Sequence, residues 1–386
     1  RAVFGMKGNL VPSFLSYLVF VGWETVLVSL ATLATGTIFV RLGGIDQDLA
    51  MVLGFILAAA LTMYGGILGH KVIMRLQKYL TIITVAATLV YIALTVDSVN
   101  WERVSSIPNG TLQGFIGALI FGITGIGLGW VNTAADYSRY LPRTTSGSAV
   151  VGWTIFGASI VPICLVIYGA LLAGSDEKLA DAIASDPIGA LTTLLPTWYL
   201  ALFALIAILG LVGGAILDLY SSGLTLISTG LPIKRYVAAT FDGLIMLAGT
   251  IYIVWIADNF FYPFQGFLIT LGVPIATWSA IFITDILLRR NPFVEADLFS
   301  ISGRYGLWNW RPLLVMAIGT FIGWGFVTNT FASWLSWQGY LLFLIGGREG
   351  PWAFANVGVI FALVIGFCGH ILISGRRIRS QDNALS

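Results

Sequence analysis

The sequence FGITGIGLGWVNTAADYSRYLPR, residues 121–143, begins as an apolar helix and ends in charged residues. It carries four glycines, Gly122, Gly125, Gly127 and Gly129, and each weakens a helix by about 1 kcal/mol relative to alanine. In a bilayer, a broken helix is tolerated only where protein buries it or where it lines a cavity. The stretch is therefore either a close-packing helix face or an unwound helix at a binding site.

The composition is that of a membrane protein. Of the 386 residues, 58% are apolar and only 10% are charged, whereas soluble domains carry about 25% charged residues. The chain is therefore expected to be an all-α polytopic protein whose main partner is the lipid bilayer. Two cysteines and two histidines are too few for a disulfide framework, a metal centre or haem ligation. The net charge of +2 says nothing about partners, because the placement of the charges matters more than their sum; no nucleic-acid partner, metal or cofactor is expected.

Ten apolar runs are long enough to cross a bilayer, which takes about 20 residues. They lie at about 10–40, 49–69, 77–97, 112–135, 148–173, 197–229, 236–257, 260–288, 312–332 and 352–374. Residues 1–374 are thus predicted to form a single transmembrane domain, and residues 375–386 a polar cytoplasmic tail.

The basic residues alternate between the loops. If the N-terminal end is cytoplasmic, sixteen of the 20 Lys and Arg residues fall in cytoplasmic segments. The external loops hold only Arg41, Arg103, Lys178 and Arg348. This alternation satisfies the positive-inside rule and predicts a multi-pass protein of the plasma membrane with both ends cytoplasmic.

Two carboxylates lie deep inside the predicted spans, Glu24 in the first and Asp218 in the sixth. Burying an ionisable residue in a membrane costs at least about 2.5–3.5 kcal/mol, so each is a functional candidate. Asp242 and Asp285 lie nearer to span ends and are expected to be structural. Small and polar residues accompany Asp218 at helical spacings: Gly214, Ser221, Ser222 and Thr225. The alternative for this stripe is a packed seam between helices.

Two tryptophans also lie inside spans, whereas most of the thirteen lie near span ends. Trp23 precedes Glu24, and Trp130 follows the glycine-rich stretch. An indole stacks well on a flat aromatic ligand, although bulk packing is the simpler alternative. Their positions favour a ligand.

Several of these segments resemble a known family. The motif GLGWVNTAADYSRYLP, residues 127–142, resembles the hallmark of the purine–cytosine permeases within nucleobase–cation symporter family 1. VGWETV, residues 21–26, resembles the third helix of that family, and LDLYSSGLTL, residues 217–226, resembles its eighth. The segment 259–290 resembles its tenth helix, and the resemblance extends over the whole chain.

The resemblance implies a LeuT-type fold. Family members have twelve helices, the first ten in two inverted five-helix repeats, with substrate held at the midplane between broken helices one and six. The ten spans of this chain would be the third to twelfth helices. Helices one and two have no counterpart in the sequence, which we expect to be trimmed at its N-terminus.

The resemblance also implies a substrate site and gates. Trp23 and Trp130 would sandwich a heterocycle, and the backbone at Gly127 and Gly129 would meet the ring edge. Asp218 stands where the family usually has Asn, and an ionised Asp only accepts hydrogen bonds. A substrate that donates there, such as cytosine or adenine, is therefore expected. The gating candidates are Gln265 and a cytoplasmic latch made by Asp136 and Arg139.

The coupling ion is expected to be a proton. Sodium-coupled relatives place hydroxyl residues in the eighth helix, where this chain has Gly213 and Gly214. Glu24 and Asp218 could instead bind protons, and a proton moving down about 100 mV supplies about 2.3 kcal/mol. A sodium ion remains possible as the co-transported cation.

The leading hypothesis is import of cytosine or a purine by cation symport. Alternatives are uptake of a vitamin-related heterocycle, such as hydroxymethylpyrimidine or a pyridoxine-like ring, and a transport-dead membrane sensor. An enzyme is disfavoured because no cytoplasmic segment carries a nucleophile–base pair or a phosphate-binding loop. The sequence makes no prediction of oligomeric state.

Overall fold

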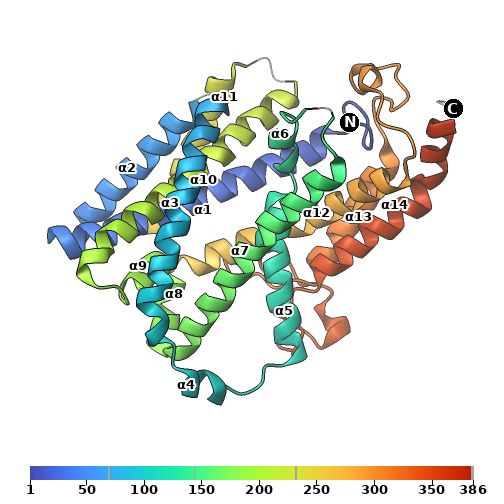
Figure 1. Cartoon of the computed structure of the whole chain (residues 1–386). Helices are drawn as coiled ribbons and strands as arrows, with labels where there is room; N and C mark the ends of the chain where they lie inside the picture. Colours follow the sequence, from blue (N-terminus) through green and yellow to red (C-terminus); the bar gives the residue numbers. More distant parts are fainter. Residues whose placement is uncertain (68–69, 143, 231–232, 384–386) are drawn as a thin grey trace.

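The computed structural model describes residues 1–386 except 68–69, 143, 231–232 and 384–386. The described residues form helices, turns and loops, without a strand (Figure 1). The long helices are α1 (Leu10–Gly43), α2 (Gln47–Ile67), α3 (His70–Thr95), α5 (Leu112–Gly122), α7 (Gly147–Ser175), α10 (Thr197–Ser228), α11 (Arg235–Trp255), α12 (Phe261–Leu288), α13 (Trp310–Gly325) and α14 (Gly358–Asn383). The short helices are α4 (Trp101–Ser106), α6 (Ala134–Ser138), α8 (Glu177–Ser185) and α9 (Pro187–Thr192). Single turns of other helix types are η1 (Val96–Ser98), η2 (Ile123–Leu128), η3 (Glu295–Phe299), η4 (Ser333–Leu335) and η5 (Leu342–Ile345).

Eight described helices are long and apolar enough to cross a membrane. Each of the ten predicted runs contains a helix, but two of these helices are shorter. Leu112–Leu128 is a short apolar helix, and α13 has only 16 residues because it ends at Gly325. The end of the second run, residues 68–69, lies outside the described residues. The all-helical prediction is therefore confirmed, and the structure supports eight spans on length and composition.

The last helix extends beyond the predicted last span, which ends at about residue 374. Helix α14 continues without a break to Asn383. Its last turns are packed, because Ile378 and Asp382 are buried and the Arg290 backbone N–H donates to Asp382 at 2.8 Å. An amphipathic continuation that covers the loop after α12 explains why polar residues here remain helical.

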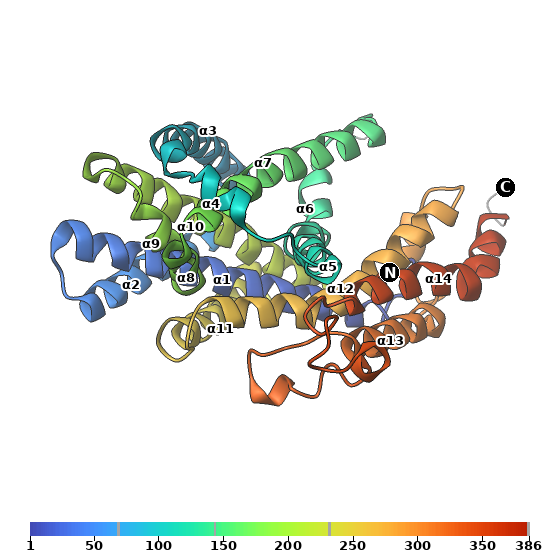
Figure 2. The ribbon, with the colours of Figure 1, turned by 90° about the horizontal axis from the view of Figure 1, so that it is seen from below.

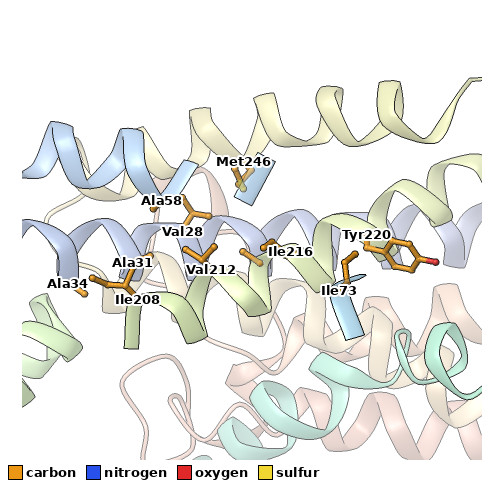
Figure 3. Close-up of a cluster of buried hydrophobic side chains, with 11 residues drawn as sticks. Val28, Ala31, Ala34, Ala58, Ile73, Ile208, Val212, Ile216, Tyr220 and Met246 are labelled. Carbon is orange, nitrogen blue, oxygen red and sulfur yellow. The ribbon is translucent and has the colours of Figure 1, made fainter. Parts of the chain in front are cut away.

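Helix α1 connects the two halves of the molecule. Its first half packs against α12, through Val19 and Ile269, and its second half packs against α2, α10 and α11. Figure 3 shows that second contact, where side chains of α1, α2, α10 and α11 pack together with Ile73 of α3. Gly54 of α2 brings the helices close, since a Cβ there would lie 2.9 Å from the Thr32 carbonyl oxygen. Small residues allow such backbone contact inside a bilayer.

Helices α12, α13 and α14 form the other half, and they lie together at the opposite end from α2 (Figure 2). Gly366 of α14 faces the Thr277 carbonyl oxygen of α12, which a Cβ would approach to 2.7 Å. Helix α7 is different, because only 6% of its most apolar 18-residue stretch is buried inside the described structure. A helix with that much outward apolar surface is suited to contact lipid.

Four segments predicted to be cytoplasmic meet at one side of the molecule. Arg1 donates to the Ser228 carbonyl oxygen at 3.1 Å, at the end of α10. Arg289, just after α12, donates to the Gln381 side chain at 3.1 Å, near the end of α14. The two chain ends lie on that same side (Figure 1).

The segments predicted to be external also meet one another. Thr37 donates to the Asp186 carboxylate at 2.8 Å, which ties α1 to the segment between α8 and α9. Arg103 and Glu177 form an exposed ion pair at 3.3 Å, which ties α4 to α8. The ends of α1, α4 and α8 that were predicted to be external therefore contact neighbouring segments with the same prediction.

Candidate functional site

The glycine-rich stretch is a helix that changes type and then breaks. Helix α5 passes into one π-helical turn, η2, and the chain leaves the helix in a turn at residues 131–133 before α6 begins. The Thr124 hydroxyl donates to the carbonyl oxygens of Ile120 and Phe121, both at 2.9 Å. Single π turns often occur at functional sites.

One face of this stretch packs on Trp23. A Cβ on Gly129 would lie 3.1 Å from the Trp23 Nε1 atom, so only glycine fits there without displacing the indole. The space left between them and the neighbouring side chains is only about 10 Å³. Gly127 is different, because a Cβ there would meet nothing within 4 Å and its backbone can be approached. The stretch thus packs closely on Trp23 at Gly129, and its backbone is accessible at Gly127.

The Trp23 ring is held by two aromatic side chains of α12. Phe264 and Phe267 contact it edge-on, with centroid distances of 5.7 and 5.8 Å. Such T-shaped contacts are favourable because the positive edge of one ring meets the negative face of the other. Trp23 is therefore fixed in orientation before any ligand arrives.

Trp23 lines a cavity of about 710 Å³ between α5, η2 and α12. Gln265, a predicted gating residue, lines the same cavity together with Phe121 and Gly125. The cavity is large enough for a small heterocycle. It offers an indole, an amide and the glycine-rich backbone on its walls.

Trp130 lies elsewhere. It is 48% exposed and lines a second cavity of about 640 Å³, with Tyr137 and with Trp153 of α7. The two tryptophans therefore do not share either of these cavities. The sandwich of a ring between Trp23 and Trp130 stays a prediction.

The two predicted carboxylates are brought together. Glu24 is fully buried and Asp218 is 7% exposed, and the two groups are close enough to interact. Because Glu24 follows Trp23 on α1, one helix turn presents an aromatic ring to the cavity and a carboxyl group to α10. Asp218 faces the same polar region as Tyr137, whose hydroxyl donates to the Leu217 carbonyl oxygen at 3.4 Å.

The latch predicted from Asp136 and Arg139 has other partners in the structure. Arg139 donates to the Tyr140 hydroxyl at 2.9 Å, and that hydroxyl lies 3.0 Å from the Tyr220 hydroxyl of α10. Burial raises the pKa of Asp136, and Ser221 and Arg139 oppose this shift. The contact between α6 and α10 therefore runs through tyrosines, with the carboxylate beside them. A gating role for either residue stays a prediction.

Sequence reasoning missed Asp242 and Tyr17. Asp242 is fully buried in α11 and interacts with both Glu24 and Tyr17. It was expected to be structural because it lies near the end of a predicted span. The missed signal was helical spacing, because Asp242 falls on the same stripe as Ala238 and Met246, which are also buried. Asp285, in contrast, has structural partners, with Arg289 at 2.6 Å and His370 at 3.2 Å.

Comparisons with known proteins agree with this architecture. Residues 1–346 match the family of permeases for cytosine/purines, uracil, thiamine and allantoin. The putative purine-cytosine permease YxlA of Bacillus subtilis is 24% identical over 364 residues, which cover 91% of this chain and 74% of the relative. The purine-cytosine permease FCY21 of Saccharomyces cerevisiae is 24% identical over 385 residues, which cover 93% of this chain and 68% of the relative.

Two solved structures share the fold. One is Mhp1, a nucleobase-cation-symport-1 family transporter, closed with bromovinylhydantoin bound, which has a TM-score of 0.64 and 18% identity. The comparison covers 100% of this chain and 82% of Mhp1. The inward-facing conformation of Mhp1 gives a TM-score of 0.62 over 80% of its length. The LeuT-type fold and the match to residues 1–346 together show that this chain belongs to the purine–cytosine permeases of nucleobase–cation symporter family 1, which are membrane transporters and not enzymes.

Proposed function

We propose that the protein imports cytosine or a purine across the plasma membrane by cation symport, with a proton as the favoured cation. The observation that carries the proposal is the position of two consecutive residues. Trp23 faces a cavity that fits a heterocycle, and Glu24 faces Asp218. A substrate-binding ring and an ionisable group therefore share one turn of α1.

Substrate recognition would combine stacking with hydrogen bonds at the ring edge. Trp23 supplies a fixed aromatic face, and the backbone at Gly122 and Gly125, which lines the same cavity, would supply polar groups. Asp218, when ionised, accepts hydrogen bonds and would favour a substrate with an exocyclic amino group. Trp130 would close on the ring only in a state in which its cavity joins that of Trp23.

The surroundings of α10 favour a proton over sodium. Gly213 and Gly214 offer no side-chain oxygen, and the Gly213 carbonyl already accepts a hydrogen bond from Gln77 at 2.6 Å. A Cβ at Gly214 would meet Leu27 at 3.0 Å, so an apolar side chain covers that position. Sodium prefers several free oxygens, whereas a proton needs one carboxyl group.

We also infer ten spans with both ends cytoplasmic. The eight long helices would be completed by Leu112–Leu128 and α13, which are short enough to need thinning of the bilayer or burial among neighbours. The meeting of Arg1 with Ser228, and of Arg289 with Gln381, supports one common side for the basic segments.

A vitamin-related heterocycle is the second candidate substrate. The matching family description includes thiamine, which contains a pyrimidine ring. Hydroxymethylpyrimidine and a pyridoxine-like ring would meet the same indole and backbone groups.

Uptake measurements test the proposed function and separate the candidates. Cells that express the full-length protein are given labelled cytosine, adenine, uracil or hydantoin, with hydroxymethylpyrimidine and pyridoxine as competitors. Saturable uptake of cytosine or adenine supports the proposal. Competition by hydroxymethylpyrimidine alone favours the second candidate, and no saturable uptake of any heterocycle refutes both.

A further inference from the structure

Three carboxyl groups lie within electrostatic range of one another in the buried contact of α1, α10 and α11. Glu24 and Asp242 are fully buried and Asp218 is 7% exposed. Asp242 and Asp218 both lie close enough to act on the Glu24 carboxyl group. Three acidic groups on three different helices would have to repel one another if all of them were ionised.

No described cation neutralises this cluster. The ion pairs of Asp285, Asp297 and Glu177 lie elsewhere in the structure. On the neighbouring α3, Arg75 and Lys78 are exposed. The described titratable groups that face the cluster are therefore acids and phenols: Tyr17 from α1, Asp218 from α10, Asp242 from α11 and Tyr137 from α6. On α2, Asp48 and Tyr64 are exposed.

The oxygens of the cluster also lack well-formed hydrogen bonds. Both carboxyl oxygens of Glu24, both of Asp242 and the Tyr17 hydroxyl are enclosed, and none makes a hydrogen bond of good geometry; their polar neighbours are one another and Ser222. Tyr17 is only 6% exposed, and its hydroxyl faces Asp242. A buried charge without a partner and a buried polar atom without a hydrogen bond both destabilise the folded protein. The site therefore needs a ligand that removes charge and supplies a donor.

A proton meets both needs. When one of two facing carboxylates is protonated, it becomes a donor to the other, and one negative charge disappears. Two carboxylates in direct contact do not both ionise, because their like charges repel strongly. The described acidic, histidine and cysteine side chains do not converge in a group of three that could hold a metal ion.

We propose that Glu24 and Asp242 share one proton and form the cation-coupling site, while Tyr17 positions Asp242 and Asp218 remains free to bind the substrate. The inference rests on the proposed proton symport and assigns a site to it. The bound proton holds α1 against α11, and its release leaves two negative charges that push the helices apart. Because Trp23 directly precedes Glu24, a substrate ring bound at the Trp23 indole is coupled to the contact between Glu24 and Asp242.

Infrared difference spectroscopy tests the site without any substrate. The purified full-length protein is shifted from acidic to alkaline pH, and the C=O stretch of buried carboxylic acids is followed. We expect Glu24→Gln and Asp242→Asn each to remove the same band that the double variant removes. The amide hydrogen of the new side chain replaces the shared proton as donor, so the remaining carboxylate stays ionised.

Two further variants complete this measurement. Asp258→Asn is the matched control, because Asp258 is exposed just beyond the other end of α11, and the band should persist. Tyr17→Phe keeps the ring and removes the hydroxyl. The carboxylic acid band should therefore remain, but it should disappear at a different pH than in the wild type. A band that survives in both single variants, or is halved in each and absent only in the double variant, would overturn the shared proton.

Transport separates this inference from the proposed function. In proteoliposomes, Asp242→Asn should lower the pH-driven accumulation of labelled cytosine at least tenfold. Wild-type accumulation that Asp242→Asn leaves unchanged would overturn the inference and leave the proposed function standing. If the wild type does not move cytosine, the proposed substrate fails, and the infrared result still decides the proton site.

Discussion

Gly129 lies directly against the indole of Trp23, so close that an added Cβ would stand 3.1 Å from Nε1. The glycine-rich helix and α1 therefore meet at the residue that faces the cavity. A substitution at Gly129 acts on the cavity wall without touching the cavity itself.

Gly129→Val should displace the Trp23 ring and weaken cytosine binding by about tenfold, equivalent to about 1.4 kcal/mol. Binding is measured by the change in tryptophan fluorescence or by equilibrium dialysis with labelled cytosine. Gly157→Ala on α7 is the control, because a Cβ there meets nothing within 4 Å. Equal affinity in Gly129→Val and the wild type would show that the contact does not shape the site.

Trp23→Ala should reduce cytosine affinity by tenfold or more, because stacking of a base on an aromatic ring is worth about 1–3 kcal/mol. Trp23→Phe keeps an aromatic face and should lose less. The ratio of the two dissociation constants, measured on protein of equal thermal stability, is the readout. If both variants bind as the wild type does, the 710 Å³ cavity is not the substrate site.

Arg289→Ala should destabilise the protein by about 3 kcal/mol. Its guanidinium donates to Asp285 at 2.6 Å in a nearly buried pair, and removal of one partner leaves the other charge buried. Thermal unfolding in detergent measures the effect, with the exposed neighbour in Arg290→Ala as control. An unchanged midpoint for Arg289→Ala would mean that solvent or lipid headgroups compensate Asp285.

Asp136→Asn should stabilise the protein at neutral pH and have no effect in acid. Burial raises the pKa of Asp136, so the folded state holds this proton to a higher pH than the unfolded chain does. Stability is therefore lost as pH rises from the pKa of Asp136 in the unfolded chain through its raised pKa in the folded state, and Asn removes this loss. Below the ordinary aspartate pKa of about 3.9, both proteins are neutral here and should melt together. A difference that is the same at both pH values would indicate a packing effect instead.

Long apolar runs were enough to predict where the helices lie, because a bilayer demands about 20 apolar residues for each span. They did not predict where helices end, as in α14, where polar residues through Asn383 stay helical by packing on the loop after α12. The carboxyl group of Glu24 stood out against an apolar background. Asp242 did not, because its burial depends on which helices surround α11, and that is a property of tertiary packing.

The cavities were the least predictable feature. Trp23 and Trp130 were expected to face each other, and each lies in a span, but Trp130, two residues after the π-helical segment, lines a cavity with Trp153 of α7. The direction of a side chain after a helix break depends on backbone angles that a glycine-rich sequence leaves open.

The central claim is that a heterocycle and a proton move together through this protein. Proteoliposomes with the full-length protein and an internal pH indicator are given cytosine in sodium-free buffer. The account predicts that cytosine accumulates under an inward proton gradient and that addition of cytosine acidifies the interior. Accumulation that requires a sodium gradient, with no change in internal pH, would contradict it.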